Sequence, residues 1–183
     1  MKHVCLLTAI AVLAVAFVSR ATARQHAPQA ANAADQALMR RLLERIDTHR
    51  EQTWSWQRLM HRPRTPYAGS AQRIPSLGYR KWVLSLWRTR AVAAKRQALE
   101  PPHRAQWLCI HHYEGSWTDP ASPYYGGLQM DLEFQATYGP ELLRAKGSAD
   151  HWTPLEQMWV AERAYRTRGF YPWPNTAHYC GLI

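Results

Sequence analysis

Cysteine is scarce in this sequence, and a hydrophobic run long enough to cross a membrane is missing. Of the 183 residues three are Cys, and the longest apolar stretch, residues 4–18, spans 15 positions. A transmembrane helix needs about 20 apolar residues, so this stretch is too short to cross a bilayer. No period of about 20–50 residues repeats along the chain, which argues against a solenoid.

Acidic side chains are also few, and they are unevenly distributed. The chain has 23 Lys+Arg against 13 Asp+Glu, a net charge of +10. Residues 24–106 hold 16 basic and five acidic side chains, whereas residues 107–183 hold five and eight. This asymmetry is typical of two regions with different partners. The composition, 46% apolar, is too hydrophobic for a wholly disordered chain, and the length fits one domain with an extension.

Residues 1–23 have the pattern of an export signal. Lys2 and His3 precede the apolar run, and Ala21-Thr22-Ala23 supplies the small residues of a cleavage site. We therefore expect cleavage at this point and a secreted protein. An uncleaved membrane anchor is the alternative.

Removal of this segment would leave two cysteines, Cys109 and Cys180. An even number in an oxidising compartment favours a disulfide, which would contribute about 4 kcal/mol by loop closure. The alternative is a zinc site, because His111 and His178 each lie two positions from a cysteine. Structural zinc sites usually have wider spacing between their ligands. We therefore expect the disulfide, with no metal and no cofactor.

The basic arm, residues 24–103, predicts two helices. An Ala/Gln-rich stretch, residues 25–34, is expected to be a flexible linker, and apolar residues at helical spacing predict a helix over 35–60. Prolines between residues 63 and 75 interrupt it, and a second helix is predicted over 77–99. The apolar side of that second helix is expected to carry Trp82, Val83, Leu86 and Trp87.

Arginine and tryptophan alternate along this arm, which suits binding to a polyanion. Nucleic acid is one such partner, but it is disfavoured behind an export signal. Anionic wall polymers and the anionic membrane surface offer the same attraction. A purely structural explanation also stands, in which the tryptophans form the core of a helical hairpin and the arginines are its solvated face.

A helix predicted over residues 104–113 ends beside a carboxylate. Gly115 is well placed to end this helix, and Trp107, Ile110 and Glu114 share the face that should be buried. Burial and the negative end of the helix dipole would both raise the pKa of Glu114. A glutamic acid that stays protonated in this way can serve as a general acid. By spacing alone, a glutamate in this position is more often a surface residue than a catalyst.

The remaining elements are short and clearly bounded. Two prolines exclude a helix over residues 117–123, and the Tyr-Tyr-Gly-Gly sequence at 124–127 suits a short strand. No Lys or Ser/Thr follows these glycines as in a phosphate-binding loop. Asp131 is expected to cap a helix that ends at Tyr138. A last helix is expected over 154–168, bounded by Thr153, Glu156 and Gly169, with Glu162 on its solvated face, followed by an extended segment 171–174.

These motifs together resemble one known family. A helix ending in Glu, then YYGGLQM, TPLEQMWVAERA, GFYPWPN and a terminal cysteine, is similar to the resuscitation-promoting factors over residues 104–182. The resemblance implies an α+β, mostly helical protein whose residues 104–183 form a small lysozyme-like domain. It also implies a secreted, cell-wall enzyme that cleaves peptidoglycan as a lytic transglycosylase.

The resemblance carries roles to individual positions. Glu114 matches the catalytic glutamate, and Cys180 matches the closing cysteine. The residues that match the loop lining the sugar cleft are Tyr124, Tyr125, Gly127 and Gln129. Trp173 matches the tryptophan before the closing cysteine. Two positions depart from the family: Tyr113 stands where a cysteine is frequent, and a shortened loop carries Asp119-Pro120. The second departure affects the details of substrate binding.

The implied reaction needs one carboxylate, Glu114, to break the β-1,4 bond between N-acetylmuramic acid and N-acetylglucosamine. A hydrolytic muramidase would need a second carboxylate. Available candidates for that role are Asp119, Asp131 and Glu133, of which Asp119 is preferred; Trp117, Trp152 and Trp173 are candidates for stacking on sugars or for the core. A non-catalytic wall-binding module and an exported nucleic-acid binder are the alternatives from other classes.

Overall fold

The computed structural model describes residues 5–183, and it describes side chains from residue 32 onward. The export signal and cleavage site expected at residues 1–23 lie outside the residues whose side chains are described. The chain divides into two compact units, one from residues up to Thr48 with Ala68–Leu86 and the other from His49–Tyr67 with Trp87–Ile183. None of the helices within the described residues is both long and apolar enough to span a membrane.

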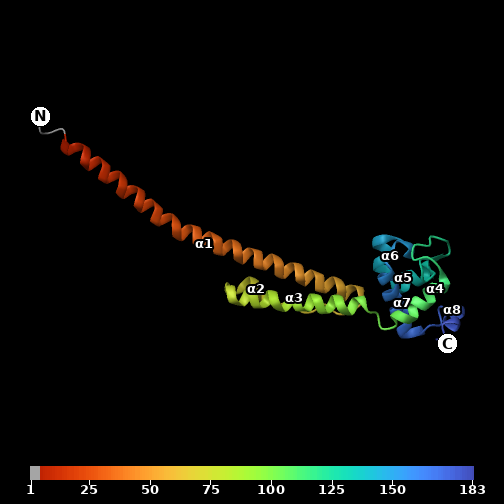
Figure 1. Ribbon diagram of the computed structural model, residues 1–183. Helices are drawn as coiled ribbons and strands as arrows, with labels where there is room; N and C mark the ends of the chain where they lie inside the picture. Colours follow the sequence, from red (N-terminus) through yellow and green to blue (C-terminus); the bar gives the residue numbers. More distant parts are fainter. Residues whose placement is uncertain (1–4) are drawn as a thin grey trace. The chain divides into compact units, whose positions relative to one another are not determined.

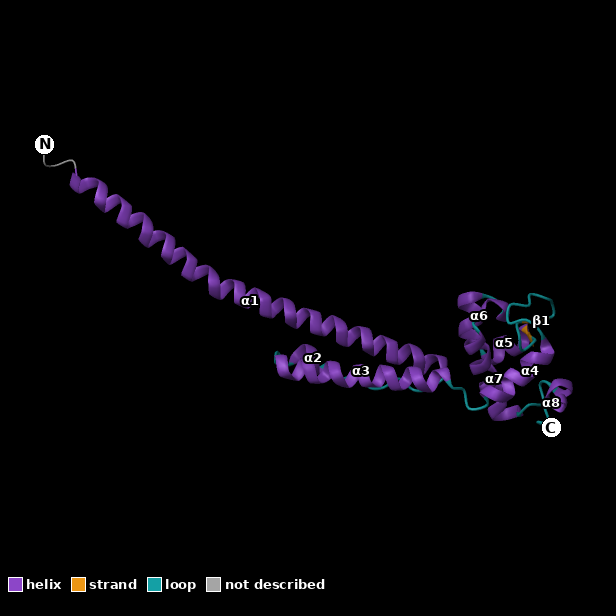
Figure 2. Ribbon diagram, in the orientation of Figure 1, coloured by secondary structure: helices purple, strands orange, loops and turns teal. Residues whose placement is uncertain are grey.

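Helices make up most of the described chain, and one small antiparallel sheet accompanies them (Figure 1, Figure 2). This arrangement confirms the α+β, mostly helical class. In the sheet, Tyr124 pairs with Asp131 and Tyr125 with Met130. The elements are α1 (Cys5–Leu59), α2 (Ser70–Arg73), α3 (Leu77–Leu99), α4 (Arg104–Glu114), β1 (Tyr124–Tyr125), β2 (Met130–Asp131), α5 (Leu132–Tyr138), α6 (Pro140–Lys146), a 3-10 turn (Ala149–His151), α7 (Pro154–Arg168) and α8 (Pro174–Tyr179).

Helix ends in the C-terminal half follow local sequence signals, as predicted. The side chain of Asp131 accepts a hydrogen bond from the backbone N–H of Phe134 and caps α5. Thr153 and Glu156 form both halves of a capping box at α7. These signals are readable in advance because a cap satisfies backbone donors only two or three residues away.

The basic arm differs from expectation in two respects. The stretch 25–34, expected as a linker, belongs to α1, consistent with the high helix propensity of its alanine and glutamine. Trp82, expected on the apolar side of α3, is 58% exposed. Val83 and Trp87 are buried as expected, and the buried positions of α3 continue at Ala91, Ala94 and Ala98. The buried face is therefore narrower than expected, and it leaves Trp82 out.

Within the second unit, residues of the arm and of the C-terminal region share a small apolar cluster. Met60, Ala98 and Trp159 are buried together there. The indole Nε1 of Trp159 donates to the carbonyl oxygen of Ala98 over 2.7 Å. The predicted boundary at residue 103 is therefore crossed by direct contacts.

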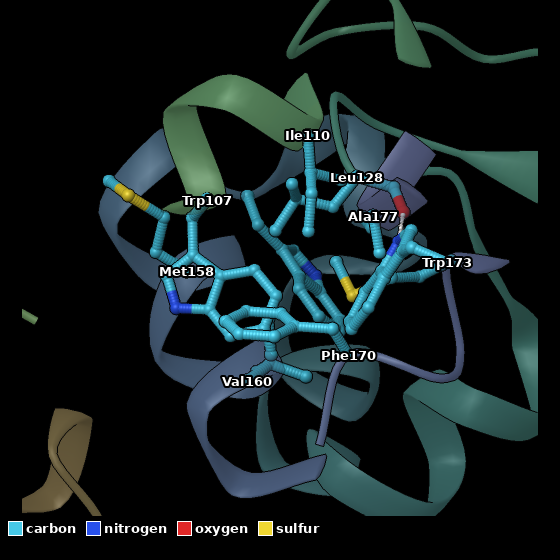
Figure 3. Packing of buried hydrophobic residues seen from close by; sticks show 12 residues of the cluster. Trp107, Ile110, Leu128, Met158, Val160, Phe170, Trp173 and Ala177 are labelled. Carbon is cyan, nitrogen blue, oxygen red and sulfur yellow. Dashed lines mark hydrogen bonds between the residues drawn. The ribbon is translucent and has the colours of Figure 1, made fainter. Parts of the chain in front are cut away.

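The core of the C-terminal region is built around tryptophan (Figure 3). Trp107 and Ile110 of α4 are completely buried, and the indole of Trp107 packs edge-on against that of Trp173 at 5.1 Å between ring centroids. Trp173 also donates from its Nε1 to the carbonyl oxygen of Leu128 over 2.6 Å. The aromatic side chains therefore connect α4, the β1–β2 turn and the segment before α8.

Glu162 is buried and not solvated. It was expected on the solvated face of α7, but it is 3% exposed. Its Oε1 accepts from the indole Nε1 of Trp107 at 2.9 Å and from the backbone N–H of His103 at 2.7 Å. The carboxylate is buried because it satisfies donors at the start of α4, which lie far away in sequence.

The expected disulfide is present, whereas the expected extended segment is partly helical. Cys109 and Cys180 are bonded, with Cα atoms 6.1 Å apart, so neither cysteine is available as a zinc ligand. Pro174 begins α8 at the first helical position, where a missing N–H costs nothing. The disulfide therefore joins α4 to the residue that follows α8.

Candidate active site

Glu114 lies at the last position of α4, at the rim of the buried face that Trp107 and Ile110 begin. It is half-buried, as its position at the helix end dictates. Gly115 follows with φ of +129°, a conformation that favours glycine and turns the chain away from the helix. The carboxyl Oε1 of Glu114 accepts a hydrogen bond from the hydroxyl of Thr176, over 2.7 Å. The carboxyl group is therefore oriented by a side chain from α8.

The loop after α4 brings a second carboxylate beside this helix end. The Nε2 of Gln129 donates to Oδ2 of Asp119 over 2.9 Å, and Oδ1 of Asp119 accepts from the backbone N–H of Ala121 over 3.0 Å. A Cβ atom placed on Gly115 would lie 3.7 Å from Asp119 Oδ2 and 4.0 Å from Gln129 Nε2. Asp119 and Gln129 therefore lie beside Gly115, the residue that follows Glu114 in the chain.

Gly127, the second glycine of the Tyr-Tyr-Gly-Gly motif, is required by close packing. A Cβ atom on Gly127 would come within 2.5 Å of Nδ1 of His111 and 2.7 Å of the Trp117 ring. His111 stacks on Trp117 with ring centroids 3.9 Å apart, and its Nδ1 contacts the carbonyl oxygen of Gly127 at 3.1 Å. Gly127 therefore serves to let the loop approach α4, and one face of Trp117 is covered by His111.

A hollow of about 530 Å³ opens beside the β1–β2 turn. Three of the residues predicted to contact sugar, Tyr124, Gln129 and Trp173, line this hollow, which we call the Gln129 hollow. Glu114 is not among the lining residues, but Gln129 lies close to Gly115, which follows Glu114 at the end of α4. The other residues that line the Gln129 hollow are Met130, Asp131, Glu133, Phe134, Thr137, Tyr138, Arg168 and Pro172.

Three of the predicted sugar contacts are instead part of the core or packed against it. Trp152 is 2% exposed and donates from its Nε1 to the carbonyl oxygen of Gly147, so it has no free face for a sugar. Tyr125 packs against the core cluster. Trp173 belongs to that cluster and is 4% exposed, so little of its ring is accessible from the Gln129 hollow. Large aromatic residues were assigned to the cleft by type, and their burial in this small domain overrides that assignment.

Two supporting residues were not identified from the sequence. Gln157 is fully buried in α7, and the carbonyl oxygens of Trp117, Ala149 and Trp152 all lie within hydrogen-bonding distance of its Nε2. Thr176 holds Glu114. A glutamine next to Met158 and Trp159, on a helix face expected to be buried, was an available signal for the first. No signal marked Thr176, because its partner is 62 residues away.

The arm residues of the second unit form a separate cluster of arginine and aromatic side chains. The guanidinium of Arg50 lies over the rings of Trp54, at 4.9 Å, and Tyr67, at 4.7 Å. Trp54 meets the buried Trp87 edge-on at 6.2 Å. Two further guanidinium groups lie over these rings, Arg64 over Trp54 and Arg90 over Trp87. The tryptophans therefore have a structural role, and they also hold arginines in place.

Comparison with protein-family models, with characterised proteins and with solved structures finds no match to this chain.

Proposed function

We propose that this protein is a secreted peptidoglycan-cleaving enzyme of the lytic transglycosylase type, with a lysozyme-like C-terminal domain and Glu114 as its general acid and base. The observation that carries the proposal is the setting of Glu114. It is a half-buried carboxyl group, oriented by Thr176, at the end of α4, and the neighbouring Gly115 lies close to Gln129, which lines a hollow of about 530 Å³. The resemblance of the sequence motifs to those of the resuscitation-promoting factors supports the same assignment.

The reaction proceeds in two steps at Glu114. The carboxylic acid protonates the oxygen that bridges N-acetylmuramic acid and N-acetylglucosamine as the glycosidic bond breaks, and positive charge develops at the anomeric carbon. The 6-hydroxyl of the same muramic acid then bonds to that carbon and returns its proton to Glu114. The product is a 1,6-anhydro sugar, and no water or cofactor is consumed.

The hydrogen bonds of Asp119 favour this mechanism over hydrolysis. Both of its carboxylate oxygens are engaged, one by the Ala121 N–H and the other by the Gln129 amide. Such a carboxylate is suited to orienting Gln129 at the entrance of the hollow. Asp131 caps α5, and Glu133 is exposed at the hollow. Glu114 is therefore the carboxyl group best placed to act alone.

The test is mass spectrometry of the muropeptides released from purified peptidoglycan. We expect the wild type to release anhydro-muramic products, and Glu114→Gln to release none while remaining folded. Glu51→Gln, which changes an exposed carboxylate in the arm, is the matched control and should behave as the wild type. Products heavier by one water would indicate a hydrolase and direct attention to Asp119. A folded wild type that releases neither product would refute catalysis and favour a wall-binding module.

We further propose that the basic arm attaches the enzyme to anionic polymers of the cell wall. Residues 49–67 and 87–99 hold eight Lys+Arg and one Asp+Glu, and several of these arginines are held over aromatic rings. Binding to walls should weaken steeply as salt rises, because counterions are released on association. Walls stripped of their anionic polymers should bind less. Equal binding to stripped walls, with salt-sensitive binding to anionic lipid vesicles, would identify the membrane surface instead.

A further inference from the structure

Thr176 is a buried polar side chain whose hydroxyl has one dominant partner. It is 8% exposed and donates to Oε1 of Glu114 over 2.7 Å. The carbonyl oxygen of Trp173 also lies within reach, but at 3.4 Å. A hydroxyl has a single proton, so the shorter contact takes it. The Thr176 proton is therefore directed at the carboxyl group.

The two helices that bring this pair together are joined covalently. Cys109 in α4 is bonded to Cys180, which directly follows α8. Further along the same helices, the rings of Tyr113 and Tyr179 are in contact, with centroids 5.5 Å apart. The disulfide and the ring contact both hold α8 against α4. The hydrogen bond between Thr176 and Glu114 is thus formed within a braced pair of helices.

We infer that Thr176 is a positioning residue for the reaction proposed above, and this inference rests on that proposal. Because Oε1 accepts the Thr176 hydroxyl, the reacting proton of Glu114 resides on Oε2. Thr176 thereby selects which oxygen of the carboxyl group faces the glycosidic bond. It also stabilises the carboxylate that remains when the proton has left.

Stabilisation of the Glu114 carboxylate makes Thr176 more important in the transition state than in the complex with bound substrate. As the glycosidic C–O bond breaks, the Oε2 proton moves to the bridging oxygen and Glu114 becomes anionic. A hydrogen bond to an ionised acceptor is about twice as strong as one to a neutral acceptor. The proton returns to Oε2 from the 6-hydroxyl when the new C–O bond forms. Loss of Thr176 should therefore lower kcat and leave KM unchanged.

The experiment measures the rate of anhydro-muropeptide release by the full-length protein and by two variants. Thr176→Val keeps the size and shape of the side chain and removes the hydroxyl, whereas Thr176→Ser keeps the hydroxyl and removes the methyl group. We expect kcat of Thr176→Val to fall about ten- to a hundredfold, with KM within about twofold of the wild type. Thr176→Ser should recover most of the lost rate. If Thr176→Val melts below the assay temperature, Thr176→Ala replaces it.

The outcomes separate this inference from the proposed function. A wild type without anhydro products refutes both. An active wild type with an equally active Thr176→Val refutes the positioning role and leaves the proposed function intact. An active wild type whose Ser and Val variants are equally impaired also refutes it, because the methyl group and its packing would then be responsible.

Discussion

The helices α3 and α4 bury a tryptophan each, yet they are held in different ways. In α3 the buried face is a stripe of Val83, Trp87 and small alanines. In α4 the buried Trp107 donates to Glu162, 55 residues away, and the helix is also tied to Cys180 by the disulfide. The positions of the first arrangement follow helical periodicity and can be read from the sequence. The second depends on contacts between distant parts of the chain, and it is the one that supports a candidate active site.

The charged side chains of the basic arm and of the C-terminal region also differ in what they contact. Most basic side chains of the arm are exposed, as expected for a surface that meets a polyanion. In the C-terminal region, several carboxylates instead accept specific hydrogen bonds within the fold. Glu162 satisfies the start of α4, Asp131 and Glu156 cap helices, and Asp119 holds Gln129. The acidic balance of residues 107–183 is therefore mainly structural.

The largest expected difference between the regions comes from removing one tryptophan in each. Trp107→Ala should lower the free energy of unfolding by about 3–5 kcal/mol, because a fully buried indole leaves a cavity. Trp82→Ala should change it by less than about 0.5 kcal/mol, since that side chain is 58% exposed. Urea denaturation of both variants measures the difference. Equal costs would show that the arm buries Trp82 in solution.

Removal of the disulfide should affect the C-terminal region strongly. Replacement of Cys109 and Cys180 by alanine should reduce the stability of the fold by about 2–4 kcal/mol. The melting temperature of the double variant, compared with that of the oxidised wild type, measures this effect. The wild type in dithiothreitol should match the variant. An unchanged melting temperature would mean that the packing of α4 and α8 suffices without the bond.

Glu162 provides a more selective test of long-range hydrogen bonding. Glu162→Ala should cost about 1–3 kcal/mol, because it leaves the Trp107 indole N–H and the His103 N–H without their acceptor. Glu133→Ala, which removes an exposed carboxylate at the second position of α5, is the control and should leave the free energy of unfolding almost unchanged. Chemical denaturation of the two variants gives the comparison. A neutral Glu162→Ala would imply that water replaces the carboxylate at the start of α4.

The smallest expected effect concerns the capping box of α7. Burial raises the pKa of Glu156, but hydrogen bonds from Lys146 and Thr153 outweigh it, so the pKa lies below its ordinary value of 4.5. The resulting stabilisation is present above that ordinary value and is lost as the pH falls through the folded-state pKa. Lys146→Met should remove about a few tenths of a kcal/mol of it. Melting temperatures between pH 7 and pH 3 should converge for wild type and variant at the acid end.

Features that neighbouring residues determine could be predicted from the sequence, whereas features that depend on distant contacts could not. The span of α3 and the caps at Asp131 and Thr153 belong to the first kind, and these predictions are confirmed. Val83 and Trp87 are buried as expected, but Trp82 was assigned to the same side of α3 by its type and is 58% exposed. Trp152 was assigned to a sugar cleft by its type, and only its packing shows that it is buried.

The sequence by itself determined the mostly helical class, the ends of the main C-terminal helices and the pairing of Cys109 with Cys180. It also placed Glu114 at the end of a helix whose face is buried. Only the tertiary structure decided what surrounds that carboxyl group: Thr176 on one side, and Asp119 with Gln129 beside Gly115. The physical reason is that periodicity and capping act within a few residues, whereas a hydrogen bond across 62 residues exists only once the helices have packed.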